Sequence, residues 1–381
     1  MRVAQAWREA ALWFPVGDVD LAGFTAHEHA CPHAGRGWSV AGAEPVDDSD
    51  SDFAGDCVLH DVAEGYVEFD HRRVRVELID GAPDAEPRDI TVRRFPDWGD
   101  VGDLVDVLDV EPVGEGRYAG RPYTGAVARI VEGSQLLAQS LVAACREVPS
   151  RRVTSAHFVF TRGADPNQPI DFTVEAHTNG RTMSTLGVRV TQAERLCAVG
   201  TVLLGTIAPD VIRHAAAAPD VAGPYDSEPY DMRVTGRDLR IVDGAYTGDP
   251  QAPVGPPVLD AWLRYRGVPD RPELRAAIVA HFTGHLSIAA ALRPHAGIGE
   301  HDAHRTLSTA INAIHVSFHA DPQPHEWLLY RHLSTFAGDG MTHAECRVFG
   351  PAEALVASFS VEAMVRRFDG KPASTDDRSV L

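Results

Sequence analysis

The stretch DRPELRAAIVAHFTGHLSIAAALRP, residues 270–294, decides the fold of this chain. Asp270 and the early Pro272 are signals with which a helix begins, and Pro294 ends it, because proline lacks the amide hydrogen that a helix interior needs. Between them the residues are small or apolar on most sides, which is typical of a buried helix. The sequence therefore predicts one long, continuous helix here.

Four apolar runs follow this helix, and each has the length and composition of a β-strand. The runs are Leu307 to Phe318, Trp327 to Leu333, Cys346 to Phe349 and Leu355 to Val365. One long helix followed by an antiparallel meander is the pattern of a hotdog fold, in which the sheet wraps around the helix.

The first half of the chain carries the same pattern. Residues 131–144 are apolar on nearly every side and predict a second buried helix. Asn179-Gly180 is a tight-hairpin signal between two of the strand-like runs that follow. These runs are Val153 to Phe160, Ile170 to His177, Thr182 to Val190 and Leu196 to Leu204. Residues 104–205 and 235–368 are therefore interpreted as two copies of one unit, and the predicted fold class is α+β, a double hotdog.

The prediction divides the chain into five parts. They are a small β-rich domain at 1–100, an N-terminal hotdog at 101–205, a Pro- and Ala-rich connector at 206–234, a C-terminal hotdog at 235–370 and a flexible tail at 371–381.

The first part resembles a small bacterial β-domain family of unknown function that is related to the β-tent folds. The resemblance rests on Phe14-Pro15, His29, Cys31-Pro32 and Gly65-Tyr66-Val67. The stretch from Glu44 to Gly55 is acidic and predicts a mobile loop.

A zinc site in this first part is an alternative to a plain solvated strand. His and Cys alternate over the residues 27–33, and Cys57 and His60 add a short-spaced pair. Zinc takes four N or S ligands, and paired short spacings supply them. No Cys-x-x-Cys pair is present, so a strand with histidines on its solvent face and a buried cysteine is favoured, and no metal is expected.

Composition excludes several classes of function. The chain has 381 residues, 44% of them hydrophobic, and a formal net charge of −19, which disfavours nucleic acid and anionic membrane surfaces as partners. Its 5 scattered cysteines imply no disulfide framework. The sequence shows neither a signal peptide nor a membrane span, and it lacks a phosphate loop, a dinucleotide fingerprint and a Gly-x-Ser-x-Gly elbow. A cytoplasmic protein is expected.

The two helix–meander units resemble the TesB-type acyl-CoA thioesterase II family over roughly residues 101–368. The anchors that carry the resemblance are Glu115-Gly116, Gly133-Ser134-Gln135, His157-Phe158, Asn179-Gly180-Arg181, Leu292-Arg293-Pro294-His295, Phe318-His319, Glu326 to Tyr330 and Ala357-Ser358. The resemblance implies acyl-CoA or acyl-carrier thioesters as substrates, no cofactor beyond the coenzyme A of the substrate, and a role in fatty acid metabolism. A homo-oligomer is also expected, because hotdog units commonly pair.

The resemblance also implies an Asp on the second long helix, a Thr or Ser on the next strand and a Gln on the last strand, which together orient the attacking water. This sequence departs at all three positions, which fall on Gly284, Ile311 and Val361. A shifted register would bring Thr309 to the hydroxyl position instead of Ile311.

Other side chains could replace this triad. His281 and His285 are four residues apart and near one helix face, and Glu132 precedes the first helix, where some single-hotdog thioesterases carry a carboxylate base or nucleophile. By strand alternation His315 and His319 are expected to point the same way as Ile311. The predicted catalytic residues are Glu132, His281, His285 and His315. The predicted substrate-binding residues are Gly133, Ser134, Gln135, Arg181, Gly284, Ile311 and Val361.

The leading functional hypothesis is thus an acyl-CoA thioesterase-like protein whose triad is replaced. Two alternatives stay open: a catalytically inactive acyl-CoA sensor or scaffold, and a hotdog hydratase or dehydratase that uses a histidine and a carboxylate. Acyl chain length and the nature of the carrier are undecided.

Overall fold

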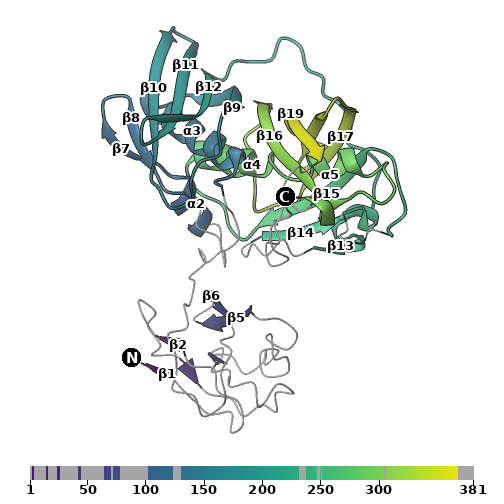
Figure 1. Ribbon diagram of the computed structural model, residues 1–381. Coiled ribbons are helices and arrows are strands. Elements are labelled where there is room, and N and C mark those ends of the chain that lie inside the picture. The colour runs from purple at the N-terminus through teal and green to yellow at the C-terminus, as the bar shows by residue number, and fades with distance from the viewer. Residues whose placement is uncertain are drawn as a thin grey trace. The chain divides into compact units, whose positions relative to one another are not determined.

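The computed structural model describes residues 102–122, 130–230, 237–246, 249, 251–303 and 306–367, together with six short strands before residue 100 (Figure 1). The chain divides into two units, Met1–Gly99 and Asp100–Leu381. In the first unit the strands form three antiparallel pairs. These are β1 (Arg2–Val3) with β2 (Phe14–Pro15), β3 (Phe24–Thr25) with β4 (Gly42–Ala43), and β5 (Glu64–Phe69) with β6 (Arg72–Glu77). The acidic loop and the His and Cys residues of the zinc hypothesis lie outside the described residues.

The N-terminal half of the second unit is a helix with a meander. Its elements are α2 (Gly102–Leu108), β7 (Glu111–Gly114), β8 (Arg117–Gly120), α3 (Gly133–Glu147), β9 (Arg152–Phe160), β10 (Ile170–Asn179), β11 (Met183–Gln192) and β12 (Arg195–Gly205). Every residue of α3 from Ser134 to Cys145 is buried, as the apolar composition predicts.

The C-terminal half repeats the pattern with additional strands before its helix. Its elements are β13 (Glu228–Pro229), β14 (Arg237–Ile241), β15 (Val258–Tyr265), α4 (Pro272–Phe282), α5 (Ser287–Leu292), β16 (Leu307–Phe318), β17 (Leu328–Gly338), β18 (Met341–Phe349) and β19 (Leu355–Arg367). β13 lies within the stretch expected to be a plain connector.

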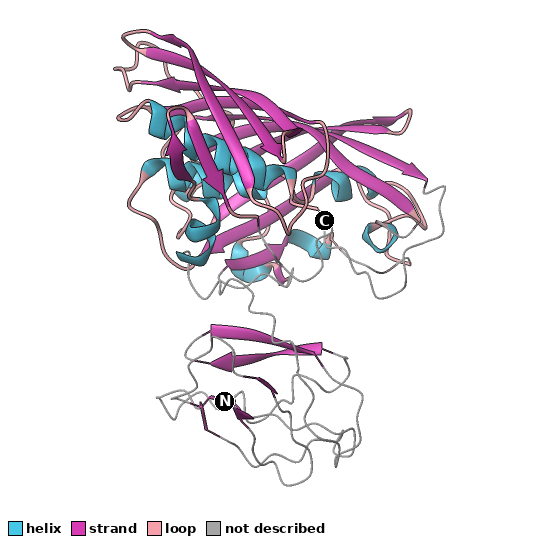
Figure 2. Ribbon diagram, turned by 60° about the vertical axis from the view of Figure 1, so that its left-hand side comes forward, coloured by secondary structure: helices cyan, strands magenta, loops and turns pink. Residues whose placement is uncertain are grey.

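The strands of the second unit form one antiparallel sheet. Their order is β13-β14-β15-β17-β18-β19-β16-β9-β12-β11-β10-β8-β7. The two halves meet where β16 pairs with β9, with His315 opposite His157. The sheet curves around the helices, and α3 packs against α4 inside it (Figures 1 and 2). The α+β double hotdog is thereby confirmed.

The prediction of one long helix between Asp270 and Pro294 was wrong. The helix α4 ends at Phe282 and α5 begins at Ser287, and Leu286 between them has a left-handed backbone with φ 67°. Glycine costs about 1 kcal/mol relative to alanine inside a helix, so Gly284 weakens this point. The Thr283 hydroxyl also donates to the Ala280 carbonyl at 2.6 Å, an alternative to helical pairing.

This broken helix is also the one segment of the described chain that could cross a membrane by length and composition. Pro272–Leu292 meets that test, but 83% of the tested window is buried inside the protein. A buried core helix has the same apolar composition as a membrane-spanning helix. The burial of this segment in the core therefore explains why it passes the test.

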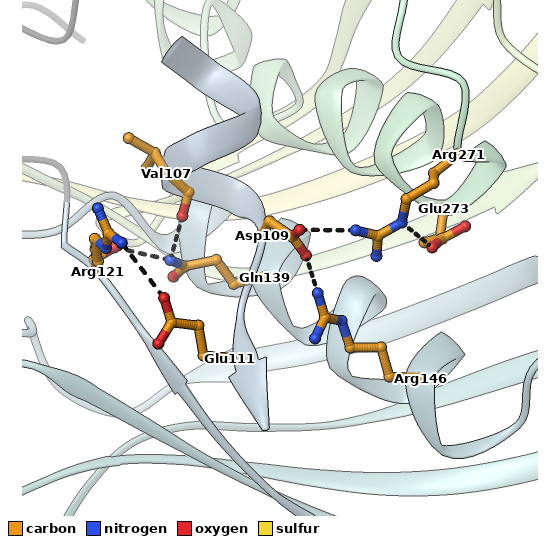
Figure 3. A network of polar contacts seen from close by, with 8 residues as sticks. All are labelled: Val107, Asp109, Glu111, Arg121, Gln139, Arg146, Arg271 and Glu273. Atoms are coloured by element: carbon orange, nitrogen blue, oxygen red, sulfur yellow. Dashed lines mark hydrogen bonds and ion pairs between the residues drawn. The ribbon is translucent and has the colours of Figure 1, made fainter. Parts of the chain in front are cut away.

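An ion-pair network sets the direction in which α3 and α4 pack (Figure 3). Asp109, just after α2, accepts one hydrogen bond from Arg146 near the end of α3 and another from Arg271 before α4, both at 2.7 Å. Arg271 also donates to Glu273 at 2.7 Å. The end of α3 therefore lies beside the start of α4. By the same antiparallel packing, the start of α3 lies beside the end of α4.

Candidate active site

Glu132 stands where α3 begins, and the backbone around it is held in place. It is the residue before the first helical turn, with the extended dihedrals φ −60° and ψ 137°. The amide of its neighbour Val131 donates to the Ala164 carbonyl at 2.8 Å. A Cβ on Gly133 would approach the Phe160 ring to 3.0 Å, so the chain turns into the helix in close contact with β9.

The end of α4 and the turn after it bring two histidines to this carboxylate. The Nε2 atoms of His281 and His285 lie 3.9 Å and 3.6 Å from Oε2 of Glu132. Both histidines are buried, and their ring centroids are 5.9 Å apart. The structure therefore brings together three of the four predicted catalytic residues, which come from opposite halves of the chain.

Burial sets the charge of this cluster. It lowers the pKa of His281 to about 3 and lowers the pKa of His285 well below its usual value, with the charge of Arg237 acting in the same direction. Both rings are therefore neutral near pH 7, and their contacts with Glu132 are not ion pairs at that pH. Burial raises the pKa of the Glu132 carboxyl, and the charge of Arg237 opposes this.

The side chain of Glu132 is partly exposed and partly buried. The side chain as a whole is 40% exposed, whereas its Oε2 atom is buried. Among the described residues no donor reaches Oε2 within hydrogen-bond geometry, and the same holds for the hydroxyl of the buried Ser134. Two polar atoms in one place therefore have unused hydrogen-bonding capacity.

Two of the three positions of the expected triad, Gly284 and Ile311, lie next to this cluster. A Cβ built on Gly284 would overlap the Ser134 hydroxyl and would lie 2.8 Å from Ser134 Cβ and 3.4 Å from Cδ1 of Ile311. Gly284 and Ile311 are thus neighbours across the helix–sheet contact. Val361 is buried on β19, opposite Ile314 of β16. Thr309 is buried too, two residues before Ile311 on the same strand.

The prediction that His315 points the same way as Ile311 was wrong. β16 pairs with β19 through Ile311 and Ala363 and then through Ala313 and Glu362, so Asn312 is one extra residue. Such a β-bulge reverses the alternation of side chains along the strand.

After the bulge Ile314 and Val316 are buried, and His315 is exposed on the outer face. There its Nε2 lies 3.1 Å from the Ser317 hydroxyl and its ring 6.1 Å from that of His157. His319 is likewise exposed on that face, 2.9 Å from the Ser358 hydroxyl. Neither histidine joins the cluster around Glu132.

Two of the predicted substrate-binding residues have other surroundings. The Gln135 amide donates to the Arg121 carbonyl at 3.0 Å, which connects α3 to the segment just after β8. Arg181 is exposed in the turn between β10 and β11.

Sequence reasoning missed Arg237 and Tyr265, which are buried on neighbouring strands and opposite each other in register. The guanidinium carbon of Arg237 lies 5.1 Å from the centroid of the Phe282 ring, and that ring stacks on His285 at 4.8 Å. Alternation along β14 was the available signal, because Arg237 shares its face with the buried Leu239. An arginine on the apolar face of a strand marks a buried charge.

A second buried polar cluster lies deeper in the same half. The Ser287 hydroxyl is 3.1 Å from Nδ1 of His332, and the Cys346 sulfur is 3.4 Å from the same nitrogen. Burial lowers the pKa of His332 to about 3 and raises the pKa of the Cys346 thiol to about 12. Near neutral pH the imidazole of His332 is therefore uncharged and Cys346 is a thiol. Within the described ranges no three His, Cys, Asp or Glu side chains are arranged to hold a metal ion.

Comparison with known proteins identifies the family. Residues 121–205 match the acyl-CoA thioesterase N-terminal domain, and residues 213–365 match the acyl-CoA thioesterase C-terminal domain. A solved acyl-CoA thioesterase II, TesB2 from Mycobacterium marinum, is 26% identical with a TM-score of 0.59, and the match covers 70% of this chain and 99% of that one. The chain belongs to the TesB-type acyl-CoA thioesterase II family.

Other members of the family give the same coverage. A TesB protein from Mycobacterium avium subsp. paratuberculosis shares the fold at 24% identity and a TM-score of 0.59, over 70% of this chain and 99% of that one. The mouse protein named acyl-coenzyme A thioesterase 8 is 25% identical over 301 residues, which are 71% of this chain and 92% of the relative. The matches cover nearly the whole length of these relatives, and both family domains lie within the second unit.

Proposed function

We propose that this protein hydrolyses acyl-CoA thioesters with Glu132 as the general base, flanked by His281 and His285, in place of the Asp, hydroxyl and Gln that the family resemblance implies. The observation that carries the proposal is the placement of Oε2 of Glu132 at 3.6 Å and 3.9 Å from the two Nε2 atoms. These distances leave the carboxylate and the imidazoles close enough to share one water molecule.

The proposed reaction begins with that water. Glu132 takes a proton from it, and the water oxygen attacks the thioester carbonyl carbon to form a tetrahedral intermediate. When the carbon–sulfur bond breaks, the proton passes from Glu132 to the departing thiolate. The products are the free acid and coenzyme A, and Glu132 returns to its ionised form.

The start of α3 supplies a place for the negative charge of the intermediate. The first amide groups of a helix have no intrahelical acceptor, and the helix dipole favours an anion there. The amides of Gly133 and Ser134 occupy that position beside Glu132. We assign them to the carbonyl oxygen as it becomes negatively charged.

The two histidines orient the reacting groups in this scheme. Because burial keeps both rings neutral, each carries one N–H and one lone pair. An Nε2–H can donate to the Glu132 carboxylate or to the water, which restricts the water to one direction of attack. His285, the nearer of the two, is expected to contribute more.

An acyl-CoA-binding protein without turnover is the second candidate. Positions 284, 311 and 361 hold Gly, Ile and Val, which have no polar side-chain group to polarise water. Ser134 also occupies the space that an Asp at position 284 would need. This candidate differs from the first in one respect only: Glu132 would be a binding group and not a base.

The discriminating experiment measures release of free coenzyme A from acyl-CoA thioesters of short, medium and long chain. Glu132→Gln is expected to lower kcat/KM by 100-fold or more, in line with the usual roughly 10²- to 10⁴-fold contribution of a general base, and His285→Ala to lower it less. His315→Ala is the matched control, since its ring lies on the outer face, and wild-type turnover is expected. Turnover that survives Glu132→Gln would overturn the assignment. Binding without any turnover would favour the second candidate, and a change at enoyl-CoA substrates would indicate hydratase chemistry.

The expected cytoplasmic location, the homo-oligomer, the role in fatty acid metabolism and the lack of a cofactor beyond coenzyme A stay predictions from the sequence. Acyl chain length belongs with them, and the substrate panel is designed to determine it.

A further inference from the structure

We propose that Arg237 is a positioning residue of this site, whose buried positive charge favours the ionised form of Glu132, the form that accepts a proton. The inference deepens the proposed function and rests on it. Arg237 belongs to β14, a strand far from both helices in sequence, and no family resemblance pointed to it.

A continuous set of contacts leads from Arg237 to the carboxylate. Arg237 is only 7% exposed, and its guanidinium lies 5.1 Å from the centroid of the Phe282 ring. The Phe282 ring is nearly parallel to that of His285, at an interplanar angle of 10°. His285 Nε2 is in turn 3.6 Å from Glu132. The end of α4 is thus held between the arginine and the carboxylate.

Arg237 is the positive charge that acts on Glu132 among the described groups near it. His281 and His285 face the carboxyl from α4 and the turn after it, and Tyr265 faces it from β15. Both histidines are neutral near pH 7, because burial lowers their pKa values. Burial raises the pKa of Tyr265, so the phenol is neutral as well.

The physical consequence follows from the low dielectric of the interior. A buried carboxyl without a positive neighbour takes up a proton instead of staying charged. A protonated Glu132 could not accept a proton from water. Burial is the larger effect and raises the pKa of Glu132, and the charge of Arg237 opposes it by lowering that pKa. Arg237 therefore leaves more of the carboxyl ionised than burial alone would.

The direct test is a titration of the Glu132 carboxyl by NMR on the full chain carrying ¹³C-labelled glutamate, with Glu132→Gln identifying the resonance. In Arg237→Gln the midpoint is expected to rise by about one pH unit or more, the usual effect of a close opposite charge. Arg237→Lys is expected to restore most of the shift. Arg240→Gln is the matched control, because Arg240 lies on the same strand with its guanidinium over Tyr225, and no shift is expected.

Activity gives an independent readout. The acid limb of the kcat/KM profile should move upward in Arg237→Gln by the same amount as the NMR midpoint, since that limb reports the free enzyme's base. In the Glu132→Gln background, adding Arg237→Gln should cause no further loss of turnover, because a residue that acts through another has nothing left to act on.

Folding of the variants is informative too. If Arg237→Gln does not fold, the double variant Arg237→Gln/Glu132→Gln is expected to fold, because it removes both buried charges. An unchanged Glu132 midpoint in folded Arg237→Gln, or failure of both variants to fold, would overturn this inference alone. Wild-type turnover in Glu132→Gln would instead overturn the proposed base and leave the titration result standing.

Discussion

At the scale of single residues, the close contact between Gly284 and Ser134 determines which side chains can occupy positions 284 and 134. The site has space for the Ser134 hydroxyl because residue 284 lacks a Cβ. An Asp at this position and a Ser at 134 therefore exclude each other. The two positions lie in different halves of the chain, Ser134 on α3 and Gly284 in the turn between α4 and α5.

An aspartate introduced at position 284 is therefore not expected to create an active triad. Gly284→Asp is expected to destabilise the protein by about 1–3 kcal/mol through overpacking, and not to raise turnover. Urea unfolding monitored by circular dichroism measures the change. The double variant Gly284→Asp/Ser134→Gly removes the overlap and should recover part of the loss. A single Gly284→Asp variant as stable as wild type would contradict the geometry.

Buried neutral histidines make stability depend on pH in a defined window. Burial lowers the pKa of His332 from the usual 6.5 to about 3, so between these values the unfolded chain binds a proton that the folded one does not. The stability due to this group is present above pH 6.5 and is lost as the pH falls towards 3, at about 1.4 kcal/mol per pH unit.

A variant at His332 separates the contribution of this histidine to the pH dependence of stability from the contributions of the carboxylates, which also titrate at acidic pH. His332→Gln cannot take up the proton, so its free energy of unfolding should fall less steeply than that of wild type between pH 6.5 and 3. Equal slopes for the two proteins in urea titrations would show that His332 is protonated in the folded state.

At the scale of elements, the direction of helix packing decides which residues meet. Asp109 between Arg146 and Arg271 places the end of α3 beside the start of α4, which leaves the start of α3 for the two histidines. The break between α4 and α5 then sets His285 outside the regular helix, in a turn beside Glu132. Neither effect is visible in one helix alone.

Removal of the Asp109 carboxylate is expected to weaken the packing of α3 against α4 and so to affect the site around Glu132. Asp109→Asn is expected to lower the free energy of unfolding by roughly 1 kcal/mol, because these ion pairs are partly exposed and screened by water. It should also lower turnover. The exposed pair of Asp210 with Arg213 offers a control, and Asp210→Asn should change neither quantity. Equal behaviour of the two variants would contradict a packing role for Asp109.

On the scale of the whole molecule, the matched family domains and the candidate site both lie in the unit Asp100–Leu381. The first unit contributes none of the site residues described above. A chain truncated to residues 100–381 is therefore expected to fold and to retain hydrolysis with unchanged kcat/KM. Loss of turnover in a truncated chain with native-like circular dichroism would assign a catalytic role to the first unit.

Much of the fold could be predicted from the sequence because it depends on short-range patterns. The apolar, small-residue stretch at 131–144 predicted α3, and the strand-like runs predicted β9 to β12, β16 and β19 closely and shorter versions of β17 and β18. Burial of one face repeats along the chain with the period of the element, so these patterns are local. The position of Glu132 at the start of a helix is local in the same sense.

Only the tertiary structure decided which of the candidate residues meet. One extra residue at Asn312 turned His315 to the outer face, and the antiparallel packing of α3 and α4 joined Glu132 to His281 and His285. Arg237 contacts Phe282, at the end of α4, from β14. These outcomes depend on register and packing between segments that are distant in the sequence, and no pattern within a single segment encodes them.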